Sequence, residues 1–329
     1  MSAARMALWA RNHSLTQSAI NSALNEGRTL VRTSCMRQTL HLLSAADFSI
    51  FIMALKPSRV EAIRRVASRF GVTENDTDRL NQAVVDALSR GPATQRELTE
   101  QIKAKAGKRI RAWMGRVWSV FRLAMVEGLI CYGPDRGKEA TLVRVDQWLP
   151  LQRQISEQEA KQVLLRRYLS AYGPATLQDF SKWSGISMKE ATPIWRSLDD
   201  EYMEVRIDDK TASLLREDCE QFLNASLSKP VLRLLPGFDP YMLAHAEKNH
   251  LVDAAFYKRV YRNQWWISPV VLLNGRVIGV WSAARRGRGS VLEVELFQKA
   301  SKIMCARIEE EAASVGAFLG VAMSLAMAS

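Results

Sequence analysis

The sequence predicts a mainly α-helical protein with β-strands, of the α+β class. It would contain repeated units of three helices and a β-hairpin, followed by a small β-barrel or sheet with a closing helix. Three observations predict this fold. Gly91-Pro92-Ala93-Thr94 recurs 82 residues later as Gly173-Pro174-Ala175-Thr176, within the same order of helical and strand-like patterns. The stretch Gly27–Leu43 reads as the hairpin of a third, incomplete copy. After Pro230 the pattern changes from helical to strand-like.

Length and composition limit the class of protein. The chain has 329 residues, of which 47% are hydrophobic and 24% are charged, so it is globular and long enough for two or three domains. Its four cysteines are far apart and show no metal-ligand spacing. We therefore expect no metal, no cofactor and a cytoplasmic, nucleoid-associated protein of the bacterial cytosol.

The uncharged tail Val315–Ala328 is too short to span a bilayer, and we expect it to end a packed helix or to form a small oligomer contact.

The positive charge is concentrated in two blocks. The net charge is +12 and the pI is about 9.7, which favours an anionic partner, either nucleic acid or an acidic membrane surface. Gln101–Val126 and Ala254–Leu292 each contain seven basic residues and no acid, so the rest of the chain is nearly neutral. Ordinary solvated faces are the alternative, and acid-free runs of 26 and 39 residues make it the weaker one.

The N-terminal part is predicted to be helical around one β-ribbon. The expected helices are, in order, Ala3–Arg11, Gln17–Asn25, about Ser44–Leu55 and a further helix to about Phe70. Ser14 or Thr16 is placed to cap the second of these helices. Pro57 is expected to separate the third from the fourth, because proline removes a backbone donor and crowds the preceding turn.

Gly27–Leu43 places Arg32, Arg37, Thr39 and His41 in a run that is otherwise apolar or small. The two kinds of residue partly alternate, which is typical of a β-ribbon with one buried and one exposed face. The wing of a winged helix is such a ribbon. Its polar face would be offered to a phosphate-rich partner.

Each repeat copy has the order helix, helix, helix, hairpin of a winged-helix unit. The first copy is predicted to contain helices Asp78–Leu88, Gln95–Ile102 and Ile110–Glu127 with strands Leu129–Tyr132 and Thr141–Val145. The second is predicted to contain helices Glu157–Ala171, Leu177–Trp183 and Met188–Leu198 with strands Met203–Ile207 and Thr211–Leu215. Thr94 or Thr176 is placed to N-cap the second helix of its copy.

The C-terminal part reads as strands and one helix. The expected elements are strands Val231–Leu235, Ser268–Leu273, Arg276–Trp281 and Ser290–Leu296 and a helix from about Lys302 to Phe318. Asn274-Gly275 is a strong type I′ turn signal between two of these strands. Gly287-Arg288-Gly289 is expected to turn the next hairpin.

The basic blocks indicate where DNA would be contacted. We expect phosphate contacts from Lys108, Arg109, Arg111, Arg116, Arg285, Arg286 and Arg288. The first of these residues open the third helix of the first copy, where free backbone N–H groups already favour phosphate. The second block also interleaves arginines with Trp265, Trp266 and Trp281, which suits base stacking. A barrel core of tryptophans with a basic rim is the alternative.

Five segments resemble the AlkZ/YcaQ family of winged-helix DNA glycosylases, and together they extend the resemblance over essentially the whole chain. They are LVRTSCMRQTLHLL (Leu30–Leu43), GPATLQDFSKWSG (Gly173–Gly185), LLPGFDPYMLAHAEK (Leu234–Lys248), YKRVY (Tyr257–Tyr261) and NGRVIGVW (Asn274–Trp281). The resemblance implies three tandem winged helices and a C-terminal β-barrel that clamp DNA. It also implies hydrolysis of the N-glycosidic bond of alkylated purines, or unhooking of interstrand crosslinks.

The resemblance also implies functional residues. Arg37, Thr39, His41 and Asp239 match the family's pattern and are expected to face the DNA or the base pocket. For Asp239 the alternative is that it caps or orders a turn, and for His41 that it is a hydrogen-bonded pocket wall.

The family's catalytic pair, a Gln-x-Gln or Gln-x-Asp, falls just before the segment that resembles Ala3–Arg11. No residue of this chain matches that pair. Gln152-Arg153-Gln154 lies in a linker, and the chain has no GxSxG, Walker, GxGxxG or HExxH motif. We therefore assign no catalytic residue. Either the pair is encoded upstream of Met1, or the protein binds DNA without efficient catalysis.

These observations together predict an incomplete first winged helix (residues 1–76), a second (77–152), a third (153–226) and a C-terminal barrel-like domain (227–329). They predict a monomeric DNA-repair protein of the glycosylase type that acts on damaged double-stranded DNA and does not bind a membrane. A non-catalytic winged-helix DNA-binding or regulatory protein is the alternative.

Overall fold

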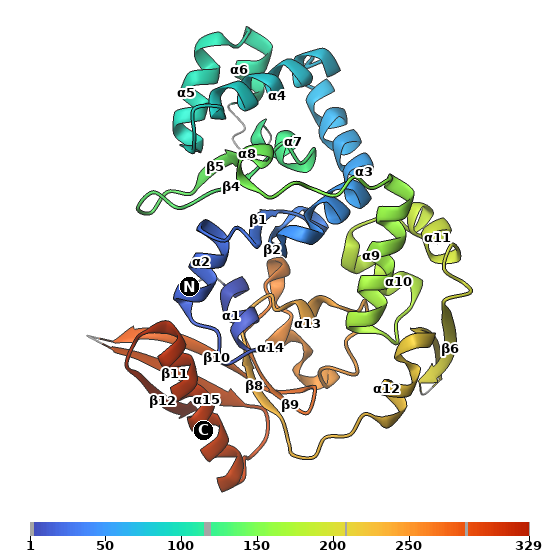
Figure 1. Cartoon of the computed structure of the whole chain (residues 1–329). Helices are drawn as coiled ribbons and strands as arrows, with labels where there is room; N and C mark the ends of the chain where they lie inside the picture. The colour runs from blue at the N-terminus through green and yellow to red at the C-terminus, as the bar shows by residue number, and fades with distance from the viewer. Residues whose placement is uncertain (1–2, 115–119, 208, 287–288, 329) are drawn as a thin grey trace. The chain divides into compact units, whose positions relative to one another are not determined.

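The computed structural model describes residues 3–114, 120–207, 209–286 and 289–328. Its contacts divide the chain into two compact units. The central unit comprises residues 21–213, and the terminal unit combines residues 1–20 with residues 214–329. Figure 1 shows the elements of both. The two ends of the chain thus belong to one unit. The finer boundaries after residues 76, 152 and 226 stay a prediction.

The central unit holds the repeat copies and the hairpin that precedes them. Its helices are α2 (Gln17–Asn25, which begins in the terminal unit), α3 (Phe48–Ser68), α4 (Glu74–Leu88), α5 (Gln95–Lys105), α6 (Lys108–Met114), α7 (Val120–Val126), α8 (Val145–Trp148), α9 (Glu157–Tyr172), α10 (Leu177–Ser184) and α11 (Met188–Arg196). Its strands are β1 (Leu30–Ser34), β2 (Leu40–Ser44), β3 (Ala93–Thr94), β4 (Ile130–Tyr132), β5 (Thr141–Arg144), β6 (Tyr202–Ile207) and β7 (Lys210–Leu215, which ends in the terminal unit). Thr16, rather than Ser14, caps α2, since its hydroxyl accepts from the Ala19 N–H (3.0 Å).

Strands β1 and β2 form the hairpin predicted for Gly27–Leu43. They are antiparallel and in register over five residue pairs. The hairpin joins the strands of the first repeat copy in one five-stranded sheet of order β2-β1-β4-β5-β3, through the pair Arg32↔Tyr132 (Figure 1). The predicted wing is therefore confirmed as a hairpin, and it extends the sheet of the copy that follows it.

Both repeat copies begin their second helix with the predicted threonine cap. The hydroxyl of Thr94 accepts from the Glu97 N–H (3.2 Å), and the Glu97 carboxylate accepts from the Thr94 N–H (2.8 Å). Thr176 and Asp179 make the same two bonds at 3.2 and 2.8 Å. These capping boxes satisfy backbone donors that have no partner inside the helix, and so they fix the first residues of α5 and α10.

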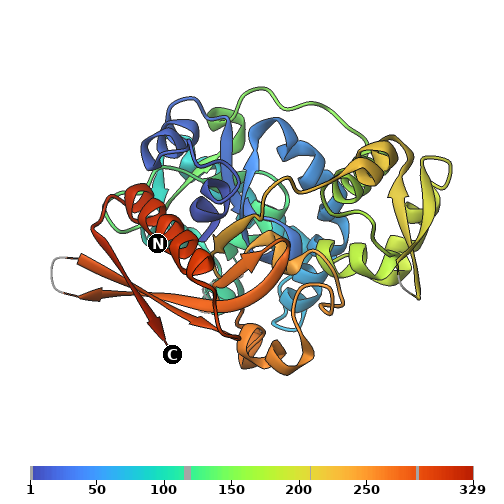
Figure 2. The ribbon, with the colours of Figure 1, turned by 90° about the horizontal axis from the view of Figure 1, so that it is seen from below.

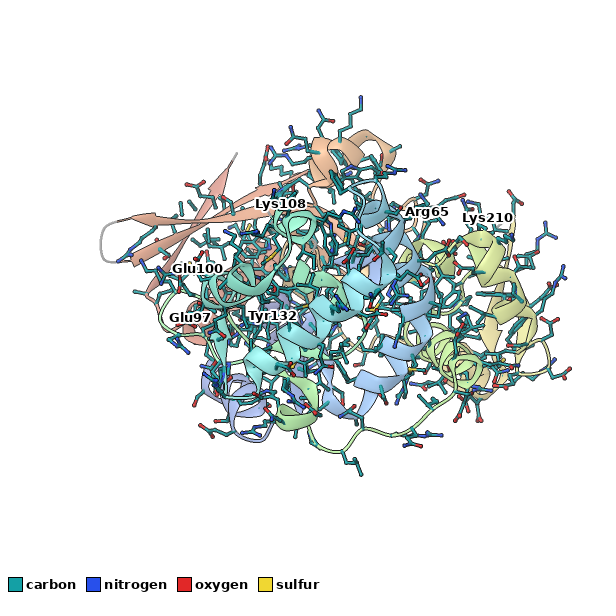
Figure 3. The ribbon with its side chains drawn as sticks, turned by 90° about the horizontal axis from the view of Figure 1, so that it is seen from above. Arg65, Glu97, Glu100, Lys108, Tyr132 and Lys210 are labelled. Carbon is teal, nitrogen blue, oxygen red and sulfur yellow. The ribbon has the colours of Figure 1, made fainter. Side chains whose placement is uncertain are left out.

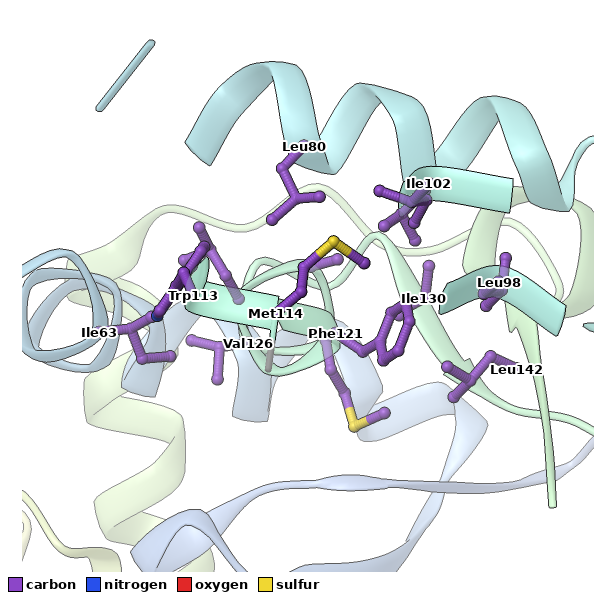
Figure 4. Packing of buried hydrophobic residues seen from close by; sticks show 14 of the residues in the cluster. Ile63, Leu80, Leu98, Ile102, Trp113, Met114, Phe121, Val126, Ile130 and Leu142 are labelled. Atoms are coloured by element: carbon purple, nitrogen blue, oxygen red, sulfur yellow. The ribbon is translucent and has the colours of Figure 1, made fainter. Parts of the chain in front are cut away.

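One hydrophobic core cluster of the central unit is formed by the first repeat copy and α3 (Figure 4). Apolar side chains from α3 to α7 and from β4 and β5 pack there against one another. Trp113 is 1% exposed, so it belongs to this core and not to the surface. The helix predicted as Ile110–Glu127 appears as α6 and α7, and residues 115–119 lie outside the described residues.

The helix break predicted at Pro57 is wrong. Helix α3 continues through Pro57 from its first to its last residue. A proline inside a helix removes one hydrogen bond and crowds the turn before it. Here both halves of the helix are anchored by buried side chains, Leu55 before the proline and Ile63 after it. Because packing holds the two halves in line, the local preference of proline for a helix end does not decide the outcome.

The terminal unit is a sheet with helices. Its helices are α1 (Ala3–Trp9), α12 (Cys219–Asn224), α13 (Pro240–Leu243), α14 (Tyr257–Val260) and α15 (Lys302–Leu319). Its strands are β8 (Leu232–Leu235), β9 (Val270–Leu273), β10 (Arg276–Arg286), β11 (Gly289–Leu296) and β12 (Met323–Ala328). The strand order is β12-β11-β10-β9-β8, and α15 packs against the sheet (Figure 2). The sheet is open, so the predicted barrel is not confirmed.

The first part of the uncharged tail, from Val315, is the end of a packed helix as expected, and the last part is a strand that was not expected. Helix α15 ends at Leu319. Gly320, which caps it, has a left-handed φ of +66°, and the Val321 N–H bonds back to the Gly316 carbonyl (3.1 Å). A Cβ at Gly316 would lie 2.7 Å from the Met323 Cβ, so only glycine lets the returning chain pass. The tail then runs as β12, parallel to β11. Glycine after a helix is a common stop signal, and here it reverses the chain.

Candidate nucleic-acid interface

The turn between β1 and β2 is a tight five-residue loop, Cys35–Thr39. Two backbone bonds close it, from the Cys35 N–H to the Thr39 carbonyl (2.9 Å) and from the Thr39 N–H to the Met36 carbonyl (3.1 Å). Arg37 and Gln38 have φ values of +53° and +60°, in the left-handed region that residues with a side chain rarely adopt. The tip of the predicted wing is therefore strained, and it needs support from its surroundings.

Arg37 supplies that support by binding the end of α10. Its guanidinium donates to the Trp183 carbonyl, and Arg59 on α3 donates to the Ser184 carbonyl at 3.5 Å. The last carbonyls of a helix carry partial negative charge and have no partner in the helix itself, so guanidinium groups stabilise them. Gly185 follows with φ +77°, and a Cβ there would lie 3.1 Å from the Arg37 backbone nitrogen. Arg37 thus joins the hairpin to the second repeat copy.

Cys35 lies at the start of the same loop and is fully buried. Burial raises the pKa of the Cys35 thiol to about 11, against the opposing effect of the nearby Arg59 guanidinium. The thiol is therefore protonated at neutral pH. A protonated, buried thiol is neither a nucleophile nor a metal ligand, so Cys35 serves the packing of the loop.

His41 is neutral at physiological pH. Its pKa is lowered to about 4, mainly by burial and also by the nearby Arg37 and Arg59 guanidinium groups, while the bond to the Thr39 carbonyl opposes this shift. Since Nδ1 lies 2.9 Å from that carbonyl oxygen, Nδ1 carries the proton and Nε2 presents a lone pair. A neutral ring of this kind accepts a hydrogen bond and does not neutralise phosphate. Thr39 beside it is exposed, and its hydroxyl donates to the Met36 carbonyl (3.1 Å).

Two further arginines connect the hairpin to the first repeat copy. Arg32 pairs with Asp135 (2.6 Å) and lies over the ring of Tyr132, at 5.0 Å from its centre. Arg122 of the first basic block donates from α7 to the Gln38 carbonyl (3.0 Å). Some arginines thus bind groups of the protein itself, so the net charge of a basic block is larger than the number of cations that a ligand can contact.

The exposed cations of the first block lie on α6. Its first turn contains Lys108, Arg109 and Arg111, and all three are exposed. Lys108 and, elsewhere in the unit, Tyr132 are labelled in Figure 3. Lys108 and Arg109 line a hollow of about 440 Å³ together with Asp76 of α4. Three of the predicted phosphate contacts are therefore brought onto one surface. The fourth, Arg116, lies outside the described residues.

The cations of the second block are distributed less uniformly. Arg285 is exposed near the end of β10, where it pairs across the hairpin with Ser290. The structure describes only the backbone of Arg286, and Arg288 lies outside the described residues. Arg259, in contrast, forms an ion pair with Glu295.

Asp239 is a structural residue of the terminal unit. It is 1% exposed, and its carboxylate caps α13 by accepting from the Tyr241 N–H (2.9 Å). The same carboxylate forms a two-pronged ion pair with Arg11, at 2.8 and 3.0 Å. The capping alternative is thus confirmed, and these partners account for Asp239 without a DNA contact. Arg37, Thr39 and His41 belong to the central unit, and their contact with DNA stays a prediction.

Other kinds of site receive no support in the described ranges. No three His, Cys, Asp or Glu side chains there are grouped as metal ligands, and the four cysteines are free thiols. No helix in those ranges combines the length and the apolar character that a membrane crossing requires. Gln152 lies in the linker before α9, where its amide donates to the Pro150 carbonyl (2.8 Å).

Comparison with known proteins connects this structure to one family. A family model described as "DNA glycosylase AlkZ-like" matches residues 1–318. The interstrand DNA cross-link repair glycosylase of Streptomyces sahachiroi is 32% identical over 316 residues, which cover 89% of this chain and 80% of that protein. The solved structure of Streptomyces sahachiroi DNA glycosylase AlkZ matches with a TM-score of 0.80 and 27% identity, over 100% of this chain and 90% of that one. The chain therefore belongs to the AlkZ-like DNA glycosylase family.

Proposed function

We propose that this protein is a DNA glycosylase that hydrolyses the N-glycosidic bond of alkylated or crosslinked purines in double-stranded DNA. The observation that carries this proposal is the match to the AlkZ-like family over residues 1–318, together with a relative named for interstrand crosslink repair. The alternative of a non-catalytic winged-helix regulator has no comparable support. The protein would act in the bacterial cytosol as a monomer.

The chemistry needs little from the protein. An N-alkylated purine is already a cationic leaving group. Hydrolysis breaks the bond between C1′ of the deoxyribose and the purine nitrogen, the base leaves with the bonding electrons, and water adds to C1′ with loss of a proton. The barrier is mainly the formation of positive charge on the sugar and the placement of that water. A pair of polar side chains, such as the family's Gln-x-Gln or Gln-x-Asp, is sufficient for this task.

The residues of this chain would hold the DNA. We assign Thr39 and His41 to the DNA side of the hairpin, since Thr39 is exposed and His41 presents a neutral acceptor beside it. Arg37 would position their loop by its bond to the Trp183 carbonyl. The phosphate contacts would come from the exposed cations of α6 and of the β10–β11 hairpin.

The test is release of a damaged base. Duplex DNA that contains 7-methylguanine is incubated with the 329-residue chain and with a chain that carries a family Gln-x-Gln segment before Ala3, and the free base is measured by chromatography. A crosslinked duplex is treated in the same way, and unhooking is followed on a denaturing gel. Base release by either chain supports the proposal. Tight DNA binding by both chains with no base release on any substrate would overturn it in favour of the regulator.

A further inference from the structure

A loop of the same kind as Cys35–Thr39 occurs in the terminal unit, at Arg262–Trp266. The same two backbone bonds close it, from the Arg262 N–H to the Trp266 carbonyl (2.8 Å) and from the Trp266 N–H to the Asn263 carbonyl (3.4 Å). Its middle residues, Gln264 and Trp265, have φ values of +60° and +63°. Two successive left-handed residues are disfavoured when neither is glycine, and more so when one is as bulky as tryptophan.

The two loops differ in what supports their tips. In the central unit, Arg37 binds the end of α10, and the Gln38 carbonyl accepts from Arg122. In the terminal unit, Trp265 is 92% exposed. Strained backbone persists only where surrounding structure or function maintains it. Contacts to the rest of the chain explain the first loop, but they do not explain why the second presents an indole to solvent.

The residue that follows Trp265 packs against a distant part of the chain. Trp266 packs edge-on against Phe238, with ring centres 5.2 Å apart and planes at 86°. Phe238 comes from a distant part of the chain and is itself left-handed, with φ +60°. Trp281 is buried in the core of the unit. The sequence alone left open whether these tryptophans form a core or a stacking surface, and the structure assigns Trp281 to the first and Trp265 to solvent.

Gln264 and Trp266, the residues on either side of Trp265, line a basic and polar hollow that Trp265 itself does not line. Lys258 and Arg262 are exposed, and neither forms an ion pair with a described residue. Together with Tyr261, Asn263, Gln264 and Trp266 they line an open hollow of about 490 Å³, whose described lining contains no carboxylate. A hollow lined by exposed cations and amides, with no carboxylate, and next in sequence to an exposed indole suits a polyanion whose bases have flat faces.

We propose that Trp265 stacks on an unpaired or displaced base of DNA, while Lys258 and Arg262 neutralise the adjacent phosphates. This inference rests on the proposed function, because it takes DNA as the ligand. An indole stacks on any base that offers a free face. A base inside an intact duplex offers none, whereas an enzyme that acts on a base must take it out of the stack and so exposes bases. Trp265 therefore recognises opened DNA in preference to paired DNA.

The test uses two duplexes of equal length, one fully paired and one with a single unpaired 2-aminopurine. Binding of the whole chain is measured by fluorescence anisotropy at one salt concentration, and quenching of 2-aminopurine reports stacking. The wild type should prefer the unpaired base by on the order of tenfold and should quench its fluorescence. Trp265→Ala should lose both effects, and Trp265→Phe should keep part of each, because a smaller ring still stacks.

Two control variants separate stacking from other causes. Ile303→Ala truncates another apolar side chain of the same unit, one that is 72% exposed, and should change neither readout. Arg262→Gln should weaken binding to both duplexes by the same factor and lower the salt dependence by about one ion. Circular dichroism of each variant verifies that it is folded.

The outcomes distinguish this inference from the proposed function. If the wild type binds both duplexes and Trp265→Ala behaves as the wild type does, stacking by Trp265 is overturned while DNA binding stands. If Trp265→Ala changes self-association and leaves both DNA readouts unchanged, the loop is a protein contact and the inference is again overturned. If the wild type binds neither duplex, both proposals are overturned.

Discussion

Gly185 is the residue at which the hairpin loop and the end of α10 meet. A Cβ at this position would lie 3.1 and 3.2 Å from the backbone nitrogen and Cα of Arg37, and φ is +77°. Gly185→Ala should therefore destabilise the protein by about 2 kcal/mol, from backbone strain plus displacement of the loop. The free energy of unfolding in urea measures this loss.

Gly71→Ala is the matched control for that prediction. Gly71 has a similar φ of +70°, but nothing lies within 4 Å of a Cβ built there. This substitution should add only the conformational strain, about 1 kcal/mol. Equal losses for the two variants would show that the contact between Gly185 and Arg37 contributes nothing to stability.

His41 should make the stability of the protein depend on pH. Its pKa is about 4 in the folded protein and about 6.5 in an unfolded chain. Between these values the unfolded chain binds more protons, so stability falls as the pH decreases from 6.5 to about 4. His41→Gln should make this fall shallower. Thermal unfolding midpoints between pH 4.5 and 7 measure the difference, and parallel curves for the two proteins would contradict a His41 that is neutral in the folded protein.

Some single residues could be predicted from the sequence, and others could not. The capping role of Asp239 follows from its place before a proline, which is a local signal, but its partner Arg11 lies far away in sequence. Arg59 was missed, although it lies four residues after the buried Leu55 on the same face of α3. The signal present in the sequence was an arginine at helical spacing from an apolar residue, Leu55. Its target, the end of α10, is a tertiary contact that no local pattern contains.

At the scale of elements, the threonine caps give a direct prediction. Thr94→Ala and Thr176→Ala each remove the side chain that holds the first turn of α5 or α10. Each should lower the free energy of unfolding by about 1 kcal/mol, whereas the corresponding serine variants, which keep the hydroxyl, should lose much less. Chemical denaturation provides the measurement. Serine and alanine variants of equal stability would mean that the cap does not set these helix starts.

The caps also show which elements the sequence can predict. The helix starts at Thr94 and Thr176 and the turn at Asn274-Gly275, where φ is +50° and +84°, depend on neighbouring residues and were predicted correctly. Helix α3 and strand β12 were not predicted correctly. The continuity of α3 depends on the side chains that pack on both sides of Pro57, and the formation of β12 depends on which strand the returning tail meets. The joining of two hairpins in one sheet is non-local for the same reason.

At the scale of the whole molecule, fewer positive side chains are available to a ligand than the total number of lysines and arginines suggests. The chain has 46 lysines and arginines, but several are engaged within it. Arg37 and Arg122 bind carbonyl groups, and Arg11 and Arg259 are paired with carboxylates. The exposed cations at the start of α6 remain available to a ligand. If DNA binds there, its affinity should depend on those side chains and not on the net charge.

Replacing Lys108, Arg109 and Arg111 together by glutamine tests this distinction. Each phosphate contact that is lost should reduce the slope of log K against log salt concentration by about 0.9, so the triple variant should lose about 2 to 3 from the slope on any duplex sequence. The control replaces three exposed lysines of the terminal unit outside the basic blocks, Lys229, Lys299 and Lys302, and removes the same charge. Its slope should stay that of the wild type. Since counterions are released only where phosphates are contacted, equal changes in the two triple variants would mean that general attraction, and not the surface of α6, brings the protein to DNA.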